Sequence, residues 1–170
     1  TNPIPNAQVK ISNSQFSTTT ITDALGNFSI PNLIIAAYDV TIGKWGYNTI
    51  CSSQNLSSAT NPHIFHLNEG YYDDFVFDFG WMVTSSASSG IWERDVPIGT
   101  TSFGGTPSNP GIDSQSDCGE EAYVTGNGGG SAGNDDIDGG ATVLTSPTFD
   151  LSTYTDPYLY FDRWFFNGGG

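Results

Sequence analysis

The net charge of this chain lies entirely in one part of it. The 170 residues carry a formal charge of −14 at pH 7, yet residues 1–68 hold two lysines and two aspartates, which cancel. Only 3 of the 21 glycines precede residue 69. Such an abrupt change of composition is typical of a boundary between domains. The sequence therefore predicts two domains, residues 1–68 and residues 69–170.

The acidic character excludes two classes of partner. Nucleic-acid binding needs a basic surface that neutralises phosphates, and attraction to anionic lipid also needs clustered cations. No apolar run approaches the ~20 residues of a membrane-spanning helix. We therefore expect no nucleic-acid partner and no membrane insertion. Hydrophobic residues make up 36% of the chain, which is enough apolar material for packed cores.

The first domain has the pattern of a small β-sandwich. Short alternating or β-branched runs at 9–11, 18–21, 28–30, 38–42 and 64–67 are separated by turn residues. No stretch has helical periodicity with caps. The string TDALGNFSIPNL, followed by YDVTIGKWGY, resembles the carboxypeptidase regulatory-like domain, with Ala36 in place of a turn glycine. That resemblance implies a transthyretin-like fold and a non-catalytic module of secreted or surface proteins.

The second domain reads as short strands joined by long polar loops. Strand candidates lie at 75–79, 91–94, 122–125, 141–144 and 158–161. The strings DDFVFDFGW, WERDVPIGTTS and YVTGNGGGSAGNDDIDGG resemble a MAM-like, concanavalin-type jelly roll found in secreted Bacteroidetes proteins, including zinc carboxypeptidases and type IX secretion substrates. Val76 and Ala122 depart from that pattern. The jelly roll needs more strands than 69–170 supply, so we expect a continuing parent chain or a partner strand to complete the sheet.

A calcium site is the main chemical expectation. The run Asn134-Asp135-Asp136-Ile137-Asp138-Gly139 alternates oxygen ligands on a tight turn, as a hard divalent cation prefers, although it is not an EF-hand. The jelly-roll resemblance implies further ligands in other loops, with Asp74, Asp78 and Asp113 as candidates. The alternative is an acidic hairpin that binds nothing. The expected cofactor is Ca2+ with a structural role.

Catalysis is not expected within this chain. His66 and Glu69 have the spacing of two zinc ligands, but no histidine follows residue 66 to complete a site. No nucleophile elbow is present. Glu93, Glu120 and Glu121 are the only candidate carboxylates for glycoside hydrolysis. The two cysteines, Cys51 and Cys118, fit either an interdomain disulfide of an oxidising compartment or two buried thiols.

Three functional hypotheses follow. The first is a secreted or cell-surface adhesion or accessory module, ordered by calcium, that contacts other domains of its parent and a glycan or protein ligand. The second is an accessory region of a secreted zinc carboxypeptidase whose catalytic domain lies outside this chain. The third is a subunit of a surface filament that associates through an open sheet edge.

Overall fold

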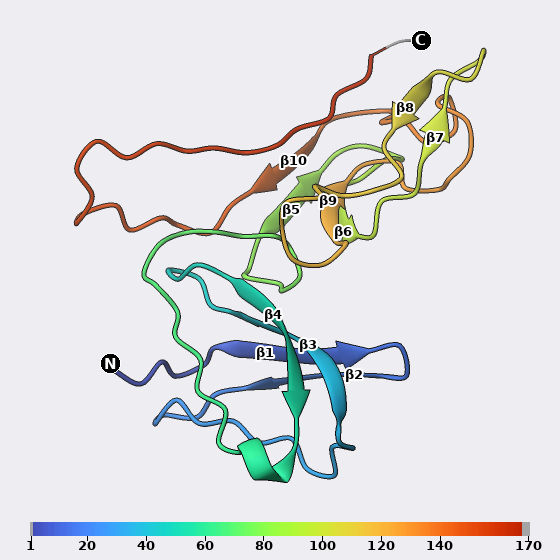
Figure 1. Ribbon diagram of the computed structural model, residues 1–170. Helices are drawn as coiled ribbons and strands as arrows, with labels where there is room; N and C mark the ends of the chain where they lie inside the picture. The colour runs from blue at the N-terminus through green and yellow to red at the C-terminus, as the bar shows by residue number, and fades with distance from the viewer. Residues whose placement is uncertain (1, 168–170) are drawn as a thin grey trace. The chain divides into compact units, whose positions relative to one another are not determined.

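The computed structural model describes residues 2–167 and divides the chain into two compact units, Thr1–Asp73 and Asp74–Gly170. Apart from one short 3-10 turn, the regular secondary structure of residues 2–167 consists of antiparallel strands, which confirms the predicted all-β class (Figure 1). In unit 1 the elements are β1 Gln8–Asn13, β2 Phe16–Ile21, β3 Ala36–Gly43, β4 Ile50–Leu56 and the 3-10 turn η1 Ser58–Thr60. In unit 2 they are β5 Met82–Ser85, β6 Glu93–Asp95, β7 Thr100–Thr101, β8 Pro107–Asn109, β9 Ala122–Val124 and β10 Thr142–Thr145. No helix of residues 2–167 is long and apolar enough to cross a membrane.

Unit 1 is organised around one four-stranded sheet in the order β2-β1-β3-β4. Successive strand side chains point to opposite faces, so alternate positions of a strand share one face. On that face Val9, Ile11, Val40 and Ile42 are at most 4% exposed, and Tyr38 joins them. The alternation predicted for 9–11 and 38–42 therefore corresponds to the buried face of the sheet.

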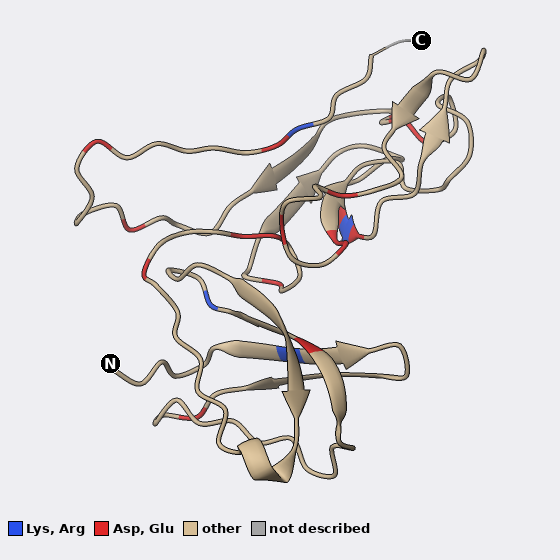
Figure 2. Ribbon diagram, viewed as in Figure 1, with Lys and Arg blue, Asp and Glu red and all other residues tan. Residues whose placement is uncertain are grey.

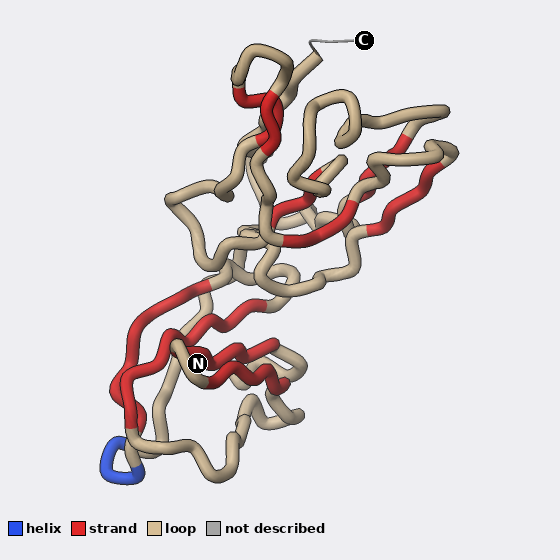
Figure 3. The backbone as a smooth tube through the Cα atoms, turned by 90° about the vertical axis from the view of Figure 1, so that its right-hand side faces the viewer, coloured by secondary structure: helices blue, strands red, loops and turns tan. Residues whose placement is uncertain are grey.

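Two further segments cover this core without becoming strands. Phe28, Ile30 and Leu33 pack against it from one loop, and Phe65 and Leu67 pack from another. The predicted strands at 28–30 and 64–67 are therefore wrong as regular strands, although most of their apolar side chains reach the core. Figure 3 colours the strands of the chain red and its loops tan. Pro31 and Pro62 border these segments, and proline has no N–H to donate to a sheet ladder.

A carboxylate fixes the tight turn that enters the first of these segments. Asp23 Oδ1 accepts hydrogen bonds from the backbone N–H groups of Leu25 and Asn27, each at 2.8 Å. Gly26 has φ +75°, a left-handed conformation that glycine adopts without steric cost. The hydrogen bond from the Asn27 backbone contributes most to lowering the pKa of Asp23.

Unit 2 contains three two-stranded ladders, β5–β10, β6–β9 and β7–β8, joined by long loops (Figure 1). The candidates at 122–125 and 141–144 correspond to β9 and β10, while β6 begins at Glu93 rather than at 91. The predicted strand at 75–79 does not form. Phe75 has φ +60°, which ends the extended alternation at that point.

The core of unit 2 is small. Val76, Phe77 and Cys118 are buried, and Phe79 packs against them. The Arg94 guanidinium donates hydrogen bonds to the carbonyl oxygens of Phe75 and Val76 at 2.8 and 3.5 Å, which ties β6 to this segment. The predicted strand at 158–161 is also wrong, since these residues are extended but form no ladder.

Candidate functional site

The glycine-rich hairpin predicted to hold calcium closes on itself through hydrogen bonds. The backbone N–H groups of Asn134 and Asp135 donate to the Ser131 carbonyl at 2.9 and 3.1 Å. The Asp135 carboxylate accepts the N–H of Gly130. A Cβ atom on Gly126, which has φ +61°, would clash with the backbone carbonyl oxygen of Asp135, so this position favours glycine. Asp135 therefore serves as an internal acceptor of the loop.

The other two aspartates of the hairpin contact a serine turn. The Asp138 carbonyl accepts the backbone N–H of Ser88 at 2.8 Å, and Asp138 Oδ2 accepts the hydroxyl of Ser89 at 3.4 Å. The Ser89 hydroxyl also lies 3.3 Å from the carbonyl of Asp136. The side chains of Asn134, Asp136 and Asp138 are exposed. These contacts join the hairpin to the turn between β5 and β6.

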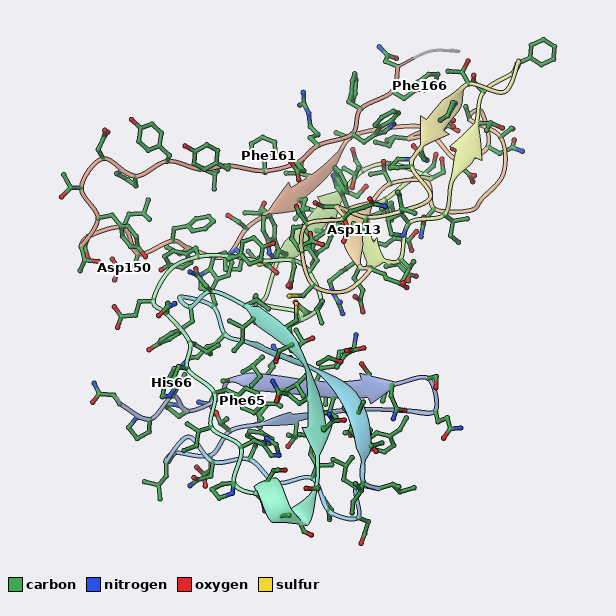
Figure 4. The ribbon with its side chains drawn as sticks, in the orientation of Figure 1. Phe65, His66, Asp113, Asp150, Phe161 and Phe166 are labelled. Atoms are coloured by element: carbon green, nitrogen blue, oxygen red, sulfur yellow. The ribbon has the colours of Figure 1, made fainter. Side chains whose placement is uncertain are left out.

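A second acidic group lies elsewhere in unit 2. Asp113 and Asp117 each have one carboxylate oxygen, Oδ2 and Oδ1 respectively, that is buried and has no hydrogen-bond partner among residues 2–167. Asp162 reaches the same region, because its Oδ2 accepts the hydroxyl of Ser114 at 3.2 Å. Glu121 contributes a further negative charge. We call Asp113, Asp117, Glu121 and Asp162 the acidic cluster; Figure 4 labels Asp113.

The electrostatics of the acidic cluster favour loss of negative charge. Burial, reinforced by the charges of Asp113 and Asp162, raises the pKa of Asp117 to about 6. The pKa of Asp113 is raised by burial first and then by the charges of Glu121 and Asp162. Desolvation and neighbouring like charge both disfavour a carboxylate, whereas a bound cation would relieve both. The acidic residues of unit 2 are coloured red in Figure 2.

Asp74 and Asp78, the remaining predicted ligands, belong to the segment that precedes β5. Asp74 is 1% exposed, and its Oδ1 accepts the N–H of Val76 at 3.4 Å. Asp78 is exposed, and its Oδ1 accepts the N–H of Gly80 at 2.8 Å. Both carboxylates therefore cap local turns.

The predicted ligands thus fall into separate local environments. Within residues 2–167 no group of three or more His, Cys, Asp or Glu side chains is arranged to hold a metal ion. The sequence reasoning selected Asp113 but missed Asp117, Glu121 and Asp162. Asp113, Asp117 and Glu121 follow one another at intervals of four residues, and this regular spacing was the sequence signal that could have indicated them. Asp162 lies too far along the chain for any sequence spacing to place it there.

His63 and the two cysteines have structural contacts. His63 Nε2 lies 3.0 Å from the Thr60 hydroxyl, and the ring of His63 stacks on Phe65. Figure 4 shows Phe65 and His66 on the segment that follows η1. Neither Cys51 nor Cys118 is a free thiol, since both are disulfide-bonded, which excludes the alternative of two buried thiols.

Comparison with known proteins supports the interpretation of the first unit. Residues 1–64 match the family model of the carboxypeptidase regulatory-like domain, which is a non-catalytic module. This confirms the resemblance for that part of the chain. Neither the curated proteins nor the solved structures contain a match to the chain. The module is compatible with an accessory role.

Proposed function

We propose that this chain is a non-catalytic accessory region of a larger secreted or cell-surface protein, and that Ca2+ stabilises its second unit. The match of residues 1–64 to a non-catalytic module supports the accessory role. The disulfide-bonded state of both cysteines supports an oxidising compartment, where such bonds persist. Adhesion to a glycan or protein ligand is the activity we propose for the region as a whole.

The observation that carries the calcium proposal is the pair of buried carboxylate oxygens on Asp113 and Asp117. A buried polar atom without a partner is costly, and carboxylate oxygens are the ligands that Ca2+ prefers. Asp113 and Asp117 would hold the ion, and Asp162 and Glu121 would supply further oxygens after their side chains rearrange. This position differs from the hairpin at residues 134–138, whose carboxylates at Asp135 and Asp138 already accept hydrogen bonds.

A cation would act on stability rather than on chemistry. A ligand that binds only the folded state adds RT ln(1 + [L]/Kd) to the free energy of unfolding, about 2.7 kcal/mol at 100 times Kd. The charge of the ion would also offset the mutual repulsion of the acidic cluster. Extracellular calcium concentrations saturate sites with Kd values of roughly 10⁻⁴ to 10⁻³ M.

Calorimetry of the whole chain in EDTA and in excess CaCl2 tests this proposal. The melting temperature of unit 2 is expected to rise with calcium. The double variant Asp113→Asn/Asp117→Asn should lose that rise, whereas Glu93→Gln/Asp95→Asn, which removes two exposed charges, should keep it. If only the variant Asp135→Asn/Asp138→Asn loses the calcium-induced rise in melting temperature, the ion binds at the hairpin, residues 134–138, instead. An unchanged melting curve, with no bound metal by elemental analysis, would exclude the ion.

The family match also favours a second candidate function. A regulatory-like domain is named for its association with carboxypeptidases, so this chain would accompany a zinc carboxypeptidase domain of the same parent. The sequence of the parent gene on both sides of this chain tests that alternative. The adhesive activity is tested on a glycan array with and without calcium, where the absence of any binder contradicts it. A native mass corresponding to a single chain would contradict a filament subunit.

A further inference from the structure

The segment that ends unit 2 exposes several large aromatic side chains. Tyr158 is 74% exposed, Tyr160 85% and Phe161 72%. Within the described part of the chain, residues 155–167 form no backbone ladder with another strand. In Figure 1 this segment follows the long excursion of the chain after β10, and Figure 4 labels Phe161 on it. Aromatic groups that are exposed together mark a candidate interaction surface.

Two of these side chains form a pair of nearly parallel rings. Residues two positions apart lie on the same face of an extended chain and about 6.6 Å apart along it. The ring centroids of Tyr158 and Tyr160 are 6.3 Å apart, and their planes differ by 31°. We call these two residues the tyrosine pair. A planar group that contacts a ring on each side at about 3.5 Å needs rings about 7 Å apart, which is close to the observed separation.

A carboxylate lies beside the tyrosine pair. Asp156 is exposed, and its Oδ2 accepts the hydroxyl of Tyr158 at 3.1 Å. The face of an aromatic ring attracts a cation through the ring quadrupole, and a nearby carboxylate adds Coulomb attraction. The tyrosine pair and Asp156 therefore combine two features of a surface that binds cations.

The charge of unit 2 also favours a cationic ligand. Residues 74–170 hold fourteen acidic and two basic residues. The guanidinium of Arg94 donates to two backbone carbonyls, and that of Arg163 lies over the ring of Phe165, 5.9 Å from its centroid. Odd-numbered positions lie on the opposite face of an extended chain from the tyrosine pair. The field of unit 2 therefore attracts cations and repels anionic ligands.

We propose that the tyrosine pair and Asp156 bind an arginine side chain on a basic segment of a protein partner. A guanidinium group is planar, weakly hydrated and stacks on aromatic faces, whereas the ammonium group of lysine is compact and strongly hydrated. A neutral glycan gains nothing from the negative charge of unit 2, so the charge favours the basic protein. The inference rests on the adhesive function proposed above and names the class of its ligand.

Fluorescence anisotropy with the full chain tests this inference. The probe is a dye-labelled peptide of Gly-Ser-Arg repeats, titrated with the chain at low ionic strength. Two matched peptides carry lysine or citrulline in place of arginine. Lysine keeps the charge without the planar group, and citrulline keeps the planar group without the charge. We expect the arginine peptide to bind most tightly and the citrulline peptide most weakly.

Removing the two rings should weaken binding of the arginine peptide. Tyr158→Ala/Tyr160→Ala should raise the Kd about five- to thirtyfold, the loss expected for two cation–π contacts at an exposed site. Tyr158→Phe/Tyr160→Phe retains both rings and should keep most of the affinity. The control Phe103→Ala, which removes an exposed ring from the β7–β8 hairpin, should bind like the parent chain.

Removing the carboxylate beside the rings should have a smaller effect. Asp156→Asn should raise the Kd for the arginine peptide about two- to fivefold, as expected for an exposed charge contact. The charge-matched control Glu93→Gln removes an exposed carboxylate from β6 and should bind like the parent chain. A melting temperature equal to that of the parent chain shows that each variant is folded.

Equal affinity for the arginine and lysine peptides would overturn the inference, as would an unchanged affinity in the alanine variant. Peptide binding would then be assigned to the general negative charge of unit 2. Glycan binding that the alanine variant loses, without binding of the arginine peptide, would also overturn it and leave glycan adhesion standing. Arginine-peptide binding that depends on the tyrosine pair, with no binder on a glycan array, would support the inference and reject the glycan as the ligand.

Discussion

Trp164 donates its indole N–H to the backbone carbonyl of Ser108, with an N···O distance of 2.6 Å across 56 positions of the sequence. The acceptor belongs to β8, a strand of only three residues. This contact attaches the segment 155–167 to a loop-rich region of unit 2. Within the described part of the chain this segment forms no backbone ladder, so its attachment depends on side-chain contacts.

Replacing Trp164 with Phe should therefore weaken unit 2. The aromatic ring stays, but the N–H donor is lost, and a typical hydrogen bond contributes about 0.5–1.5 kcal/mol. Urea unfolding followed by circular dichroism measures the change. Phe103, which is fully exposed at the tip of the β7–β8 hairpin, provides the control Phe103→Leu, for which no comparable loss is expected. Equal stability of the two variants would contradict the structural role of the indole.

Thr22 should be intolerant of an isosteric apolar substitution. Its hydroxyl accepts the N–H of Ala7 at 2.9 Å and donates to the carbonyl of Ile4 at 2.6 Å, and the residue is 6% exposed. Valine keeps the shape but leaves a buried donor unsatisfied, which costs about 1–3 kcal/mol. Denaturant unfolding of Thr22→Val is compared with that of Thr19→Val on the exposed side of β2. A loss of stability in both variants alike would point to another cause.

Shortening a core side chain of the four-stranded sheet should have a larger effect. Ile11 is 3% exposed, and replacing a buried isoleucine with alanine typically costs about 2–5 kcal/mol because a cavity remains. Ile34, at 78% exposed, gives a control in which the same substitution should change stability by less than about 0.5 kcal/mol. Thermal unfolding measures both. A small effect at Ile11 would mean that the loops over the sheet collapse into the space.

The stability of unit 2 should fall as the pH rises through the titration of its acidic cluster. The folded-state pKa values of Asp113 and Asp117 are raised above the ordinary 3.8, that of Asp117 to about 6. Between these values the folded state binds more protons than the unfolded state, so the free energy of unfolding decreases with increasing pH. Melting curves in EDTA from pH 4.5 to 7.5 measure the slope.

The matched variant Asp113→Asn/Asp117→Asn should flatten this slope. Asp150 has the opposite effect on the pH dependence of stability, because a hydrogen bond from the Ser152 hydroxyl lowers the pKa of its carboxyl group. Its contribution to the free energy of unfolding is lost only below pH 3.8, the ordinary pKa of an aspartate, and so outside the measured range. A slope that persists in the double variant would assign the pH dependence to other groups.

The strands of the four-stranded sheet of unit 1 could be predicted from the sequence, because the alternation of apolar and polar residues is a local pattern. Val9 and Ile11, and likewise Val40 and Ile42, alternate with polar neighbours, and that alternation corresponds to one buried face. The strand predicted at 28–30 failed for a different reason. Its apolar residues do reach the core, but ladder formation depends on a partner strand and on N–H donors, which periodicity does not report.

The candidate site was only partly predictable. Asp113 was selected by resemblance, and the hairpin at residues 134–138 by its spacing, yet spacing does not show that Asp135 already accepts the N–H of Gly130. Whether a carboxylate is available for a cation depends on which donors reach it and on how far it is buried. Both are properties of packing.

Residue types and short spacings were enough to specify the all-β class, the regulatory-like pattern of residues 1–64 and the concentration of negative charge after residue 68. These depend on residue types and short spacings, which the chain carries in any conformation. Only the tertiary structure brought Asp162 to Asp113 and Asp117, and burial together with the neighbouring negative charges raised the pKa values of Asp113 and Asp117. Desolvation and Coulomb repulsion depend on distances in space. Asp162 lies 45 or more positions from Asp113 and Asp117, so its charge affects their pKa values only when the chain folds.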